Sequence, residues 1–426
     1  MMGSKHLVLL LLVIMVSTCS WGDFLENPNV KFSGFGTVAV DHSNNHDADW
    51  ISTMEETSGV GYSTPTSIAP DTILAAQADV HVNSKLSATA QLVSRSLIDG
   101  TATPYFEWAL IRYRPTENSI LRLGRMSNNT FLYSDTRLVG YVRPTIHLPF
   151  TYMLNPIDQI NGADYEYSFR HGDTFYQLSG NMGVFNQNYD TFAPPEGDVF
   201  RVHAKLASLH FAANNCNNGF RLSYQEGRLK LMDANYDMFW QNLDQLLSAG
   251  IPGSREVASN TGINNVLFRY VDAAYTYDSD RWLFVAEWTR NYIHTDLTLP
   301  ASQSFYLQGG IHIKDFTPYI QFEDTRQEAN PSNLRTINAP DALSNQAAFV
   351  NGFGQSIQQG TNNSFVFTTG FKYDFEKNLD FKVQYDYIIK PAGSQSRFAY
   401  FNPNVTDFIS NRESIQLFAA AIDFVF

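Results

Sequence analysis

The stretch ESIQLFAAAIDFVF, residues 413–426, decides how the rest of the chain is interpreted. Apolar residues recur in it at every second position, namely Phe418, Ala420, Ile422, Phe424 and Phe426. The opposite parity is less uniform and carries Asp423. Because successive side chains of a β-strand point to opposite faces, the pattern predicts a strand with one apolar face that runs to Phe426.

The same two-residue alternation recurs along the whole chain. In FVFTTGFKYDF (365–375), five aromatic residues share one parity, while Lys372 and Asp374 lie on the other. Sixteen segments follow the pattern, at about 31–40, 73–82, 84–95, 105–114, 118–126, 161–170, 174–182, 198–211, 218–226, 264–278, 281–292, 303–314, 316–326, 364–375, 378–389 and 412–426. The facing of four of them stays open because both parities carry apolar residues: 105–114, 118–126, 264–278 and 281–292.

Short and long connections alternate between these segments. RHGD (170–173) and FEKN (375–378) are short, whereas 127–160 and 327–363 are long. Antiparallel strands joined in this way form an up-and-down barrel with two different ends. With both chain ends at the short-turn end, the strand number is even, and we predict sixteen strands, with the first paired to the last.

The apolar faces are expected to point outward into lipid. A soluble β-sandwich, which buries its apolar faces, is the alternative. Most of the segments are longer than the usual strand of about 5–6 residues. Aromatic residues such as Trp282 and Phe375 lie at strand ends, where membrane interfaces are expected. Lipid also requires a spanning sheet to close, because unpaired backbone groups are costly there.

The first 22 residues have the pattern of a secretory signal peptide. The apolar run LVLLLLVIMV (7–16) follows a basic start and is too short to span a membrane as a helix. We expect cleavage near Ser20 or Gly22, and Cys19 leaves a lipoprotein as an alternative. Residues 23–426 would then form a single barrel domain.

Composition excludes several classes of protein. The net charge of −13 argues against nucleic acid as a partner. After signal removal only Cys216 remains, so the chain is not a disulfide scaffold. No cofactor and no metal are expected, and no nucleophile arrangement predicts an enzyme.

At this level of detail the chain resembles the Gram-negative outer-membrane porins. The signal peptide, sixteen alternating segments, long fifth-to-sixth connection and terminal Phe426 carry the resemblance over the mature chain. Four stretches are similar to a little-characterised proteobacterial subgroup: FSGFGTVAV (32–40), LSATAQLVSR (86–95), EWALIRYRPTENSILRLGR (107–125) and YSDTRLVGYVRP (133–144).

The resemblance implies an all-β transmembrane barrel of sixteen antiparallel strands, with short periplasmic turns and long external loops. It also implies a homotrimer in the outer membrane, in contact with lipid and lipopolysaccharide. It further implies passive diffusion of small hydrophilic solutes and insertion by the barrel-assembly machinery. In this family that machinery recognises a final aromatic strand, so Phe426 is the candidate assembly signal; the alternative is an interface aromatic only.

The connection 127–160 is the candidate constriction loop. In porins the corresponding loop folds into the lumen, and its apolar composition here suits a packed lining. The alternatives are an external cap or a trimer contact. Its candidate constriction residues are Asp135, Arg137, Arg143 and His147. It lacks the acidic cluster of general diffusion porins, so a neutral to mildly anion-preferring pore is expected.

Charged residues on the polar parity are candidates for the lumen wall. On the second to ninth segments they include Lys85, Arg95, Arg122, Arg201, Lys205 and Arg221, with Glu107 and Asp164. On later segments they include Glu287, Glu323, Asp386 and Asp423, with Arg269 and Lys382. Arg122, Arg137 and Arg143 either meet a permeating anion or pair with lumen carboxylates and brace the wall.

Other functions stay open as alternatives. An adhesin would use the long polar loops 41–72, 227–263 and 327–363, and an outer-membrane hydrolase would need outward His and Ser residues. The segment DHSNNHDAD (41–49) could hold a divalent cation, although a solvated loop is the simpler interpretation.

Overall fold

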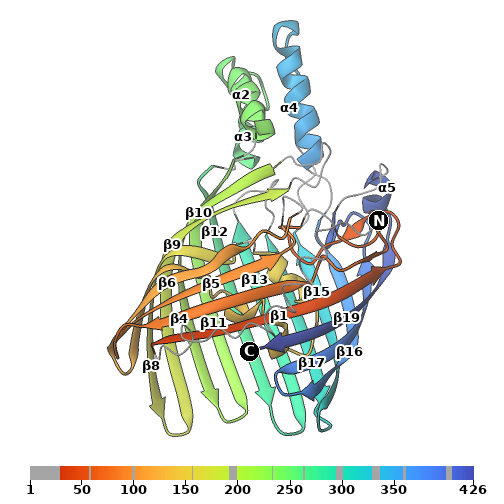
Figure 1. Ribbon diagram of the computed structural model, residues 1–426. Helices are drawn as coiled ribbons and strands as arrows, with labels where there is room; N and C mark the ends of the chain where they lie inside the picture. Colours follow the sequence, from red (N-terminus) through yellow and green to blue (C-terminus); the bar gives the residue numbers. More distant parts are fainter. Residues whose placement is uncertain are drawn as a thin grey trace.

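The computed structural model is a closed β-barrel with helices projecting from one end (Figure 1). It describes residues 29–56, 59–97, 101–155, 157–190, 199–232, 234–261, 264–293, 301–328, 336–357, 361–399 and 405–426. The predicted signal peptide at 1–22 lies outside these residues.

Sixteen long strands of the described chain form the barrel wall. They are β1 (Val30–Ser43), β4 (Ile73–His81), β5 (Leu86–Arg95), β6 (Tyr105–Thr116), β7 (Ser119–Ser127), β8 (Gln159–His171), β9 (Thr174–Asp190), β10 (Val199–Asn215), β11 (Asn218–Met232), β12 (Val266–Asp278), β13 (Trp282–Ile293), β14 (Ser302–Ile311), β15 (Phe316–Gln327), β16 (Ser364–Glu376), β17 (Leu379–Lys390) and β19 (Glu413–Val425). The sixteen strands predicted from the alternation are therefore confirmed.

The barrel closes between its first and last strands, as predicted. β1 and β19 pair antiparallel, with Val38 opposite Ile422. Phe426 joins this ladder, because its N–H donates to the carbonyl of Gly34 at 3.0 Å and its own carbonyl accepts from the Gly34 N–H at 3.0 Å. The sheet therefore leaves no open edge at this seam, as a membrane-spanning sheet requires.

Two glycines of β1 make room for the aromatic rings of β19. A Cβ built on Gly34 would lie 2.4 Å from Cζ of Phe426 and 2.6 Å from the carbonyl oxygen of Ala75. A Cβ on Gly36 would lie 2.5 Å from Cζ of Phe424. The two rings cross β1 over these positions, so glycine is needed for close approach.

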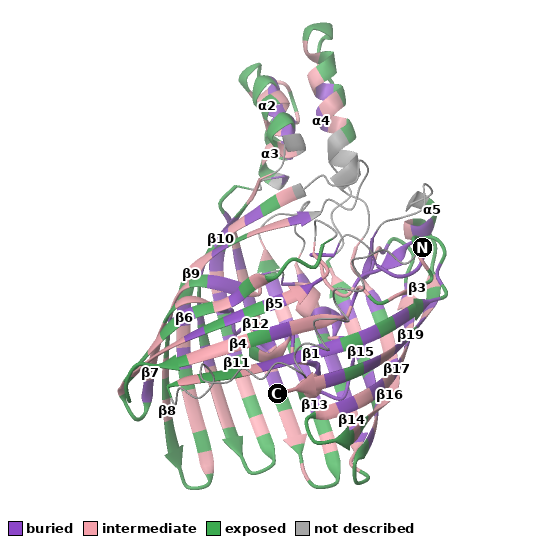
Figure 2. Cartoon of the chain, viewed as in Figure 1, coloured by how far each residue is buried: buried purple, intermediate pink, exposed green. Residues whose placement is uncertain are grey.

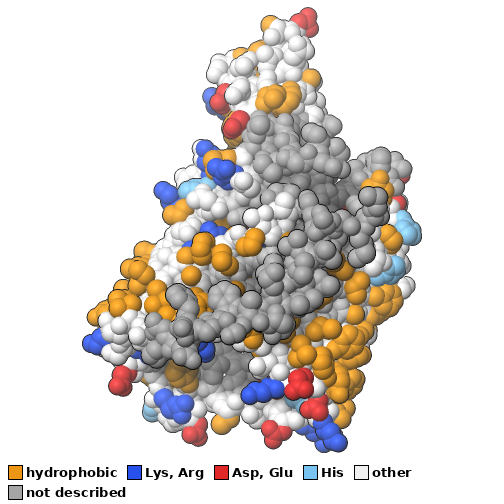
Figure 3. All heavy atoms as spheres, viewed as in Figure 1, with side chains coloured by type: hydrophobic (Ala, Val, Ile, Leu, Met, Phe, Trp, Pro, Cys, Tyr) orange, Lys and Arg blue, Asp and Glu red, His pale blue; other side chains and the backbone are white. Residues whose placement is uncertain are grey.

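Burial alternates along the strands of the barrel (Figure 2). On β19, Phe418 and Ile422 are 47% and 43% exposed, whereas Leu417 and Ala419 are buried. Apolar side chains cover the outer wall around the C-terminal strands, and charged side chains gather at the short turns (Figure 3). The expected outward direction of the apolar face of β19 is confirmed.

The two ends of the barrel differ, as the connection lengths predicted. The longer connections carry β2 (Asp49–Trp50), β3 (Thr66–Ser67), β18 (Phe398–Ala399), α2 (Ala234–Ser248), α3 (Ser254–Asn260), α4 (Ser344–Ile357), α5 (Val405–Ser410) and the 3₁₀ helix η4 (Asp341–Leu343). The opposite end has tight turns such as 172–173 and 377–378. No helix among the described residues is long and apolar enough to cross a membrane.

Helices α2, α3 and α4 share an apolar core of their own above the barrel. Phe239, Leu243 and Leu246 of α2 are fully buried, and they cluster with Val257 of α3 and Val350 of α4. This group, called the helical projection below, joins the connection after β11 to the connection after β15 (Figure 1).

Candidate functional site

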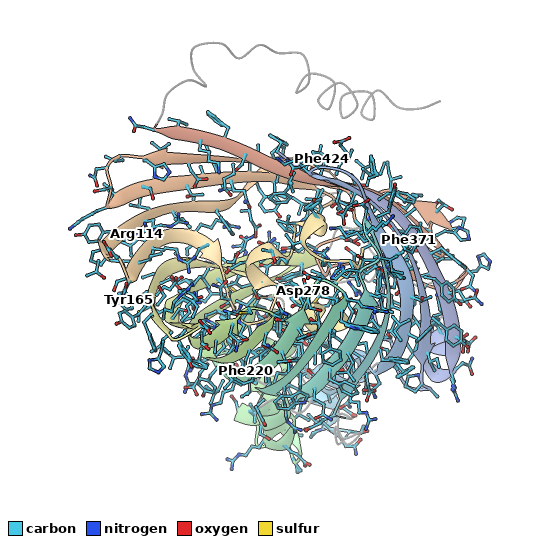
Figure 4. All side chains as sticks on the ribbon, turned by 90° about the horizontal axis from the view of Figure 1, so that it is seen from below. Arg114, Tyr165, Phe220, Asp278, Phe371 and Phe424 are labelled. Carbon is cyan, nitrogen blue, oxygen red and sulfur yellow. The ribbon has the colours of Figure 1, made fainter. Side chains whose placement is uncertain are left out.

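The connection between β7 and β8 lies inside the barrel. It carries three 3₁₀ helices, η1 (Ser134–Thr136), η2 (Gly140–Val142) and η3 (Phe150–Met153). Seen from the short-turn end, this yellow segment lies within the ring of strands (Figure 4). Of the predicted alternatives, the described part of the loop therefore follows the one in which the chain folds into the lumen.

The loop is bound to the opposite wall by its own backbone. The N–H of Leu132 donates to Glu287 of β13 at 2.6 Å. The N–H of Phe150 donates to Glu323 of β15 at 2.5 Å. On β17, Gln384 accepts from the Ile146 N–H at 2.7 Å. These buried wall acceptors satisfy loop N–H groups that have no partner in regular secondary structure.

A further wall residue holds the two ends of the loop together. Gln225 of β11 is fully buried, and its side-chain oxygen accepts from Thr130 Oγ1 at 2.6 Å and from Asn155 Nδ2 at 3.2 Å. The sequence reasoning missed Gln225 and Gln384, although both lie on the polar parity of their strands. An amide side chain on the inward-facing, polar parity of a strand is the sequence signal that could have identified Gln225 and Gln384.

Arg137 braces the loop against the near wall. Its Nη2 lies 2.8 Å from Glu107 of β6 and 2.8 Å from Asp158. Although burial lowers the pKa of Arg137, Asp158 and Glu107 together hold it above its ordinary value. Glu107 also accepts a hydrogen bond from Gln159. The guanidinium is thus engaged with two carboxylates, as one of the two predicted alternatives stated.

A β-bulge explains how Glu107 reaches the interior. Gln91 of β5 pairs with Trp108 of β6, but the next residue, Leu92, pairs with Phe106, so Glu107 is the extra residue. Phe106 is exposed on the outer wall, and Glu107 is buried. A bulge redirects a side chain in this way, and it accounts for the mixed parity of this segment.

Arg143 stabilises the fold of the loop itself. Its Nη1 donates to the carbonyl of Arg137 at 3.0 Å and its Nη2 donates to that of Ile146 at 3.1 Å. Arg143 forms no ion pair with any described residue. The guanidinium of Arg143 is therefore hydrogen-bonded to backbone carbonyls, and no described carboxylate in contact with it neutralises its charge.

Asp135 is the loop carboxylate that meets water inside the barrel. The residue is exposed to solvent. It lies in the electrostatic field of Arg122 of β7 and Arg221 of β11. Arg122 in turn is paired with Asp164 of β8 at 2.7 Å. These charges line a water-accessible space within the barrel.

His147 joins the loop to three carboxylates. Its Nδ1 lies 2.7 Å from Asp386 of β17, and its Nε2 lies 3.1 Å from both Asp41 of β1 and Asp71. Although burial lowers the pKa of His147, the carboxylates of Asp71, Asp386 and Asp41 hold it well above its ordinary value. Asp71 precedes β4 in a connection, and nothing in the sequence pattern pointed to it.

The remaining wall candidates divide into inward and outward residues. Arg95, Arg122, Arg221, Glu287 and Glu323 face the interior, and Arg95 is ion-paired with Glu55. Lys85 is exposed in the turn between β4 and β5, so it does not belong to the lumen wall.

The prediction that Arg201 and Lys205 line the lumen is wrong. Both are exposed with Leu209 on the outer face of β10, while Val202, Ala204 and Leu206 are buried on the inner face. These inner residues pack in an apolar cluster with Phe185 and Phe268. Arg269 lies outward for the same reason, because its neighbours Phe268 and Tyr270 are buried inside.

Comparisons with known proteins agree with this architecture. No protein-family model matches the chain, and no curated protein sequence matches it. The outer-membrane channel DcaP of Acinetobacter baumannii is similar in structure, with 9% identity, a TM-score of 0.54, and coverage of 93% of this chain and 97% of that one. The anion-selective porin of Comamonas acidovorans has 11% identity, a TM-score of 0.54 and coverages of 93% and 99%.

A trimer form of in-vitro folded OmpT, an outer-membrane protein of Vibrio cholerae, has 10% identity, a TM-score of 0.50 and coverages of 93% and 99%. At such identities the likeness concerns the fold. The chain therefore has the fold of the sixteen-stranded outer-membrane porins.

Proposed function

We propose that this chain is an outer-membrane channel for passive diffusion of small hydrophilic solutes and ions. One observation carries the proposal: a loop lies within a closed sixteen-stranded barrel, and its Asp135 is exposed to water-accessible space beside Arg122 and Arg221. A channel of this kind works by pore radius and electrostatics. We propose no catalytic role.

The constriction is formed by the loop 127–160, in this proposal. The loop's ties to β6, β11, β13, β15 and β17 would hold it as a fixed lining. Mild anion preference would come from Arg143 and Arg221, since neither forms an ion pair with a described residue. The Comamonas acidovorans neighbour, described as anion-selective, shows that this fold can support such a preference.

The exposed apolar wall supports an outer-membrane location in contact with lipid, after export directed by residues 1–22. A single barrel domain over 23–426 and insertion by the barrel-assembly machinery with Phe426 as its signal belong to the same proposal. A homotrimer is proposed because a trimer form occurs among proteins of this fold.

Lipopolysaccharide contact is proposed at the end of the barrel that carries the helices. Basic residues gather there on the outer face of β10, β11 and β12, namely Arg201, Lys205, Arg228, Lys230 and Arg269. Arg269 is paired with Glu226, and the set keeps an excess of positive charge. Such a patch suits phosphorylated head groups of the outer leaflet. It is called the outer basic patch below.

Planar-bilayer recording of the purified, folded chain tests the channel. We expect stepwise conductance and a reversal potential in a salt gradient that indicates weak anion preference. Asp135→Asn is expected to strengthen the anion preference, because it removes a negative charge from the water-accessible space. Asp341→Asn, an exposed acid of η4 beside the helical projection, is the matched control and should change nothing.

A folded wild-type protein without conductance would reject the channel. Strong cation selectivity would reject only the anion preference.

A further inference from the structure

Three carboxylates and one imidazole meet where the loop touches the first and last parts of the wall. Asp41 comes from β1, Asp71 from the connection before β4, and Asp386 from β17. His147 of the loop lies at their centre, within 2.7 Å to 3.1 Å of each carboxylate. The side chains of Asp41 and His147 are 0% and 5% exposed.

Protonation of His147 alone does not neutralise the three carboxylates of this cluster. An imidazolium carries one positive charge against three carboxylates. None of these carboxylates forms an ion pair with a lysine or arginine of the described chain. Arg397 lies in the electrostatic field of Asp71 and Asp386, but the hydrogen bonds of its guanidinium go to backbone carbonyls. Burying uncompensated negative charge is costly, so the site favours an additional cation.

Two oxygens of the cluster accept no hydrogen bond from the described part of the chain. Nε2 of His147 has a single hydrogen to donate, and the hydrogen bond that it forms is to Asp41 Oδ1. Oδ2 of Asp41 is buried and accepts no hydrogen bond from a described residue. Oδ2 of Asp71 lies 3.1 Å from Nε2 of His147, but no described residue forms a hydrogen bond with it either. A buried carboxylate oxygen without a donor is rare in native structures, and it indicates a place where a water molecule or an ion binds.

The other side of the ring is arranged as it is around metal-binding histidines. Nδ1 of His147 contacts Asp386 Oδ2 at 2.7 Å, and Asp386 accepts from Thr368 at 2.6 Å and from Gln384 at 3.0 Å. Trp50 packs against the imidazole with ring centroids 4.5 Å apart. A carboxylate on one nitrogen fixes the tautomer and leaves the other nitrogen free to ligate.

We propose that Asp41, Asp71 and His147 bind a divalent transition-metal ion of the Zn²⁺ type. One atom from each residue lies within 4.8 Å of the others, so a single ion can contact all three. One imidazole nitrogen with two carboxylate oxygens is a donor set that Zn²⁺ accepts, whereas Ca²⁺ prefers six or more oxygens. The ion replaces the Nε2 proton, and Asp386 keeps the ring in place.

This inference goes beyond the channel function and does not depend on it. The ion would connect the constriction loop to β1 and to the segment preceding β4 at one point. Asp41 begins the acidic and His-rich segment 41–49 of the sequence, but its partners come from elsewhere in the fold.

Calorimetric titration of Zn²⁺ into the untagged full chain, folded in detergent and stripped with a chelator, tests the site. We expect one tight Zn²⁺ per chain. His147→Gln and Asp71→Asn should each weaken Zn²⁺ binding by at least about tenfold, and Asp386→Asn by about 10–100-fold. Heat-dependent gel mobility confirms that each variant is folded.

His312→Gln is the matched control, because His312 faces a single exposed carboxylate, Asp278, at 3.0 Å. It should leave Zn²⁺ binding unchanged. A folded wild type that takes up no Zn²⁺ would overturn the proposal, and so would equal affinities for wild type and for folded Asp71→Asn. Because the readout is metal binding, this result is independent of whether the barrel conducts.

Discussion

Gly34 shows how a single position controls the seam of the barrel. The ring of Phe426 lies over it, the carbonyl of Ala75 approaches from β4, and both of its own backbone groups bond to Phe426. The apolar parity of β19 predicted the aromatic face. The need for glycine opposite it follows only from the register of β1 on β19, which brings together residues from the two ends of the chain.

Gly34→Ala is therefore expected to destabilise the barrel by about 1–3 kcal/mol, because the new methyl group overlaps Phe426 and the Ala75 backbone. Gly309→Ala is the control, since a Cβ on this strand glycine of β14 meets nothing within 4 Å. Urea unfolding in detergent measures both. Equal midpoints for the two variants would contradict the close packing described for Gly34.

The buried carboxyl group of Glu56 predicts that the stability of the folded state depends on pH. Burial raises the pKa of Glu56 to about 8, despite hydrogen bonds from Ser52. The folded state thus binds this proton more tightly than the unfolded state, where the pKa is about 4.5. Its stabilising contribution is full below the unfolded-state pKa and is lost as the pH rises through about 8.

Protease resistance of the connection between β1 and β4 should accordingly fall across this pH range. In Glu56→Gln the neutral amide removes the titration, so resistance should vary less with pH. Thr64→Ser, a conservative change at a half-buried position in the same connection, is the control and should keep the wild-type profile. A profile unchanged by Glu56→Gln would assign the pH dependence to another group.

At the scale of elements, alternation predicted every barrel strand but not the facing of all of them. The reason is visible on β10, where Val202, Ala204 and Leu206 pack inside against Phe268, so the apolar parity is the inner one near the helical end. Where a strand extends beyond the lipid, its outer face meets water and its inner face can be apolar. The two-residue alternation shows that the strand has two different faces, but it does not show which of them points outward. The loop anchors Gln225 and Asp71 were missed because they depend on contacts distant in sequence.

The outer basic patch belongs to this reversed part of β10. Lys205→Glu combined with Arg228→Glu is expected to weaken binding of lipopolysaccharide, because two phosphate-binding cations become repulsive. Arg170→Glu, an exposed position of β8 near the opposite end, is the control. Co-purification of lipopolysaccharide, measured by phosphate content, compares them. Equal content in all three proteins would exclude the patch as a binding surface.

The position of the loop 127–160, the proposed constriction, depends on Arg137. Arg137→Ala leaves buried Glu107 without its cation, and loss of one member of a buried ion pair costs about 3–5 kcal/mol. We expect noisier single-channel currents and a shift towards cation preference, because Glu107 and Asp158 become unpaired. Arg326→Ala removes a 69% exposed arginine and should leave both properties unchanged. Wild-type currents from folded Arg137→Ala would remove Arg137 from the constriction.

At the scale of the whole molecule, the barrel and the helical projection have separate apolar cores. Leu243→Asp places a charge at a fully buried site among α2, α3 and α4, so the projection should become protease-sensitive while conductance persists. Met238→Asp, on the same helix at a 46% exposed position, should remain resistant. Loss of conductance in Leu243→Asp would show that the projection also shapes the entrance.

The anchoring of the inner loop has a mechanical consequence. The loop forms hydrogen bonds to residues of four different strands, namely Glu287, Glu323, Gln225 and Gln384. Moving the loop out of the lumen therefore requires breaking all four attachments together. If the proposed channel conducts, a loop held in this way should act as a fixed filter. We therefore expect its size limit to be the same at every voltage and to widen only when the lining is mutated.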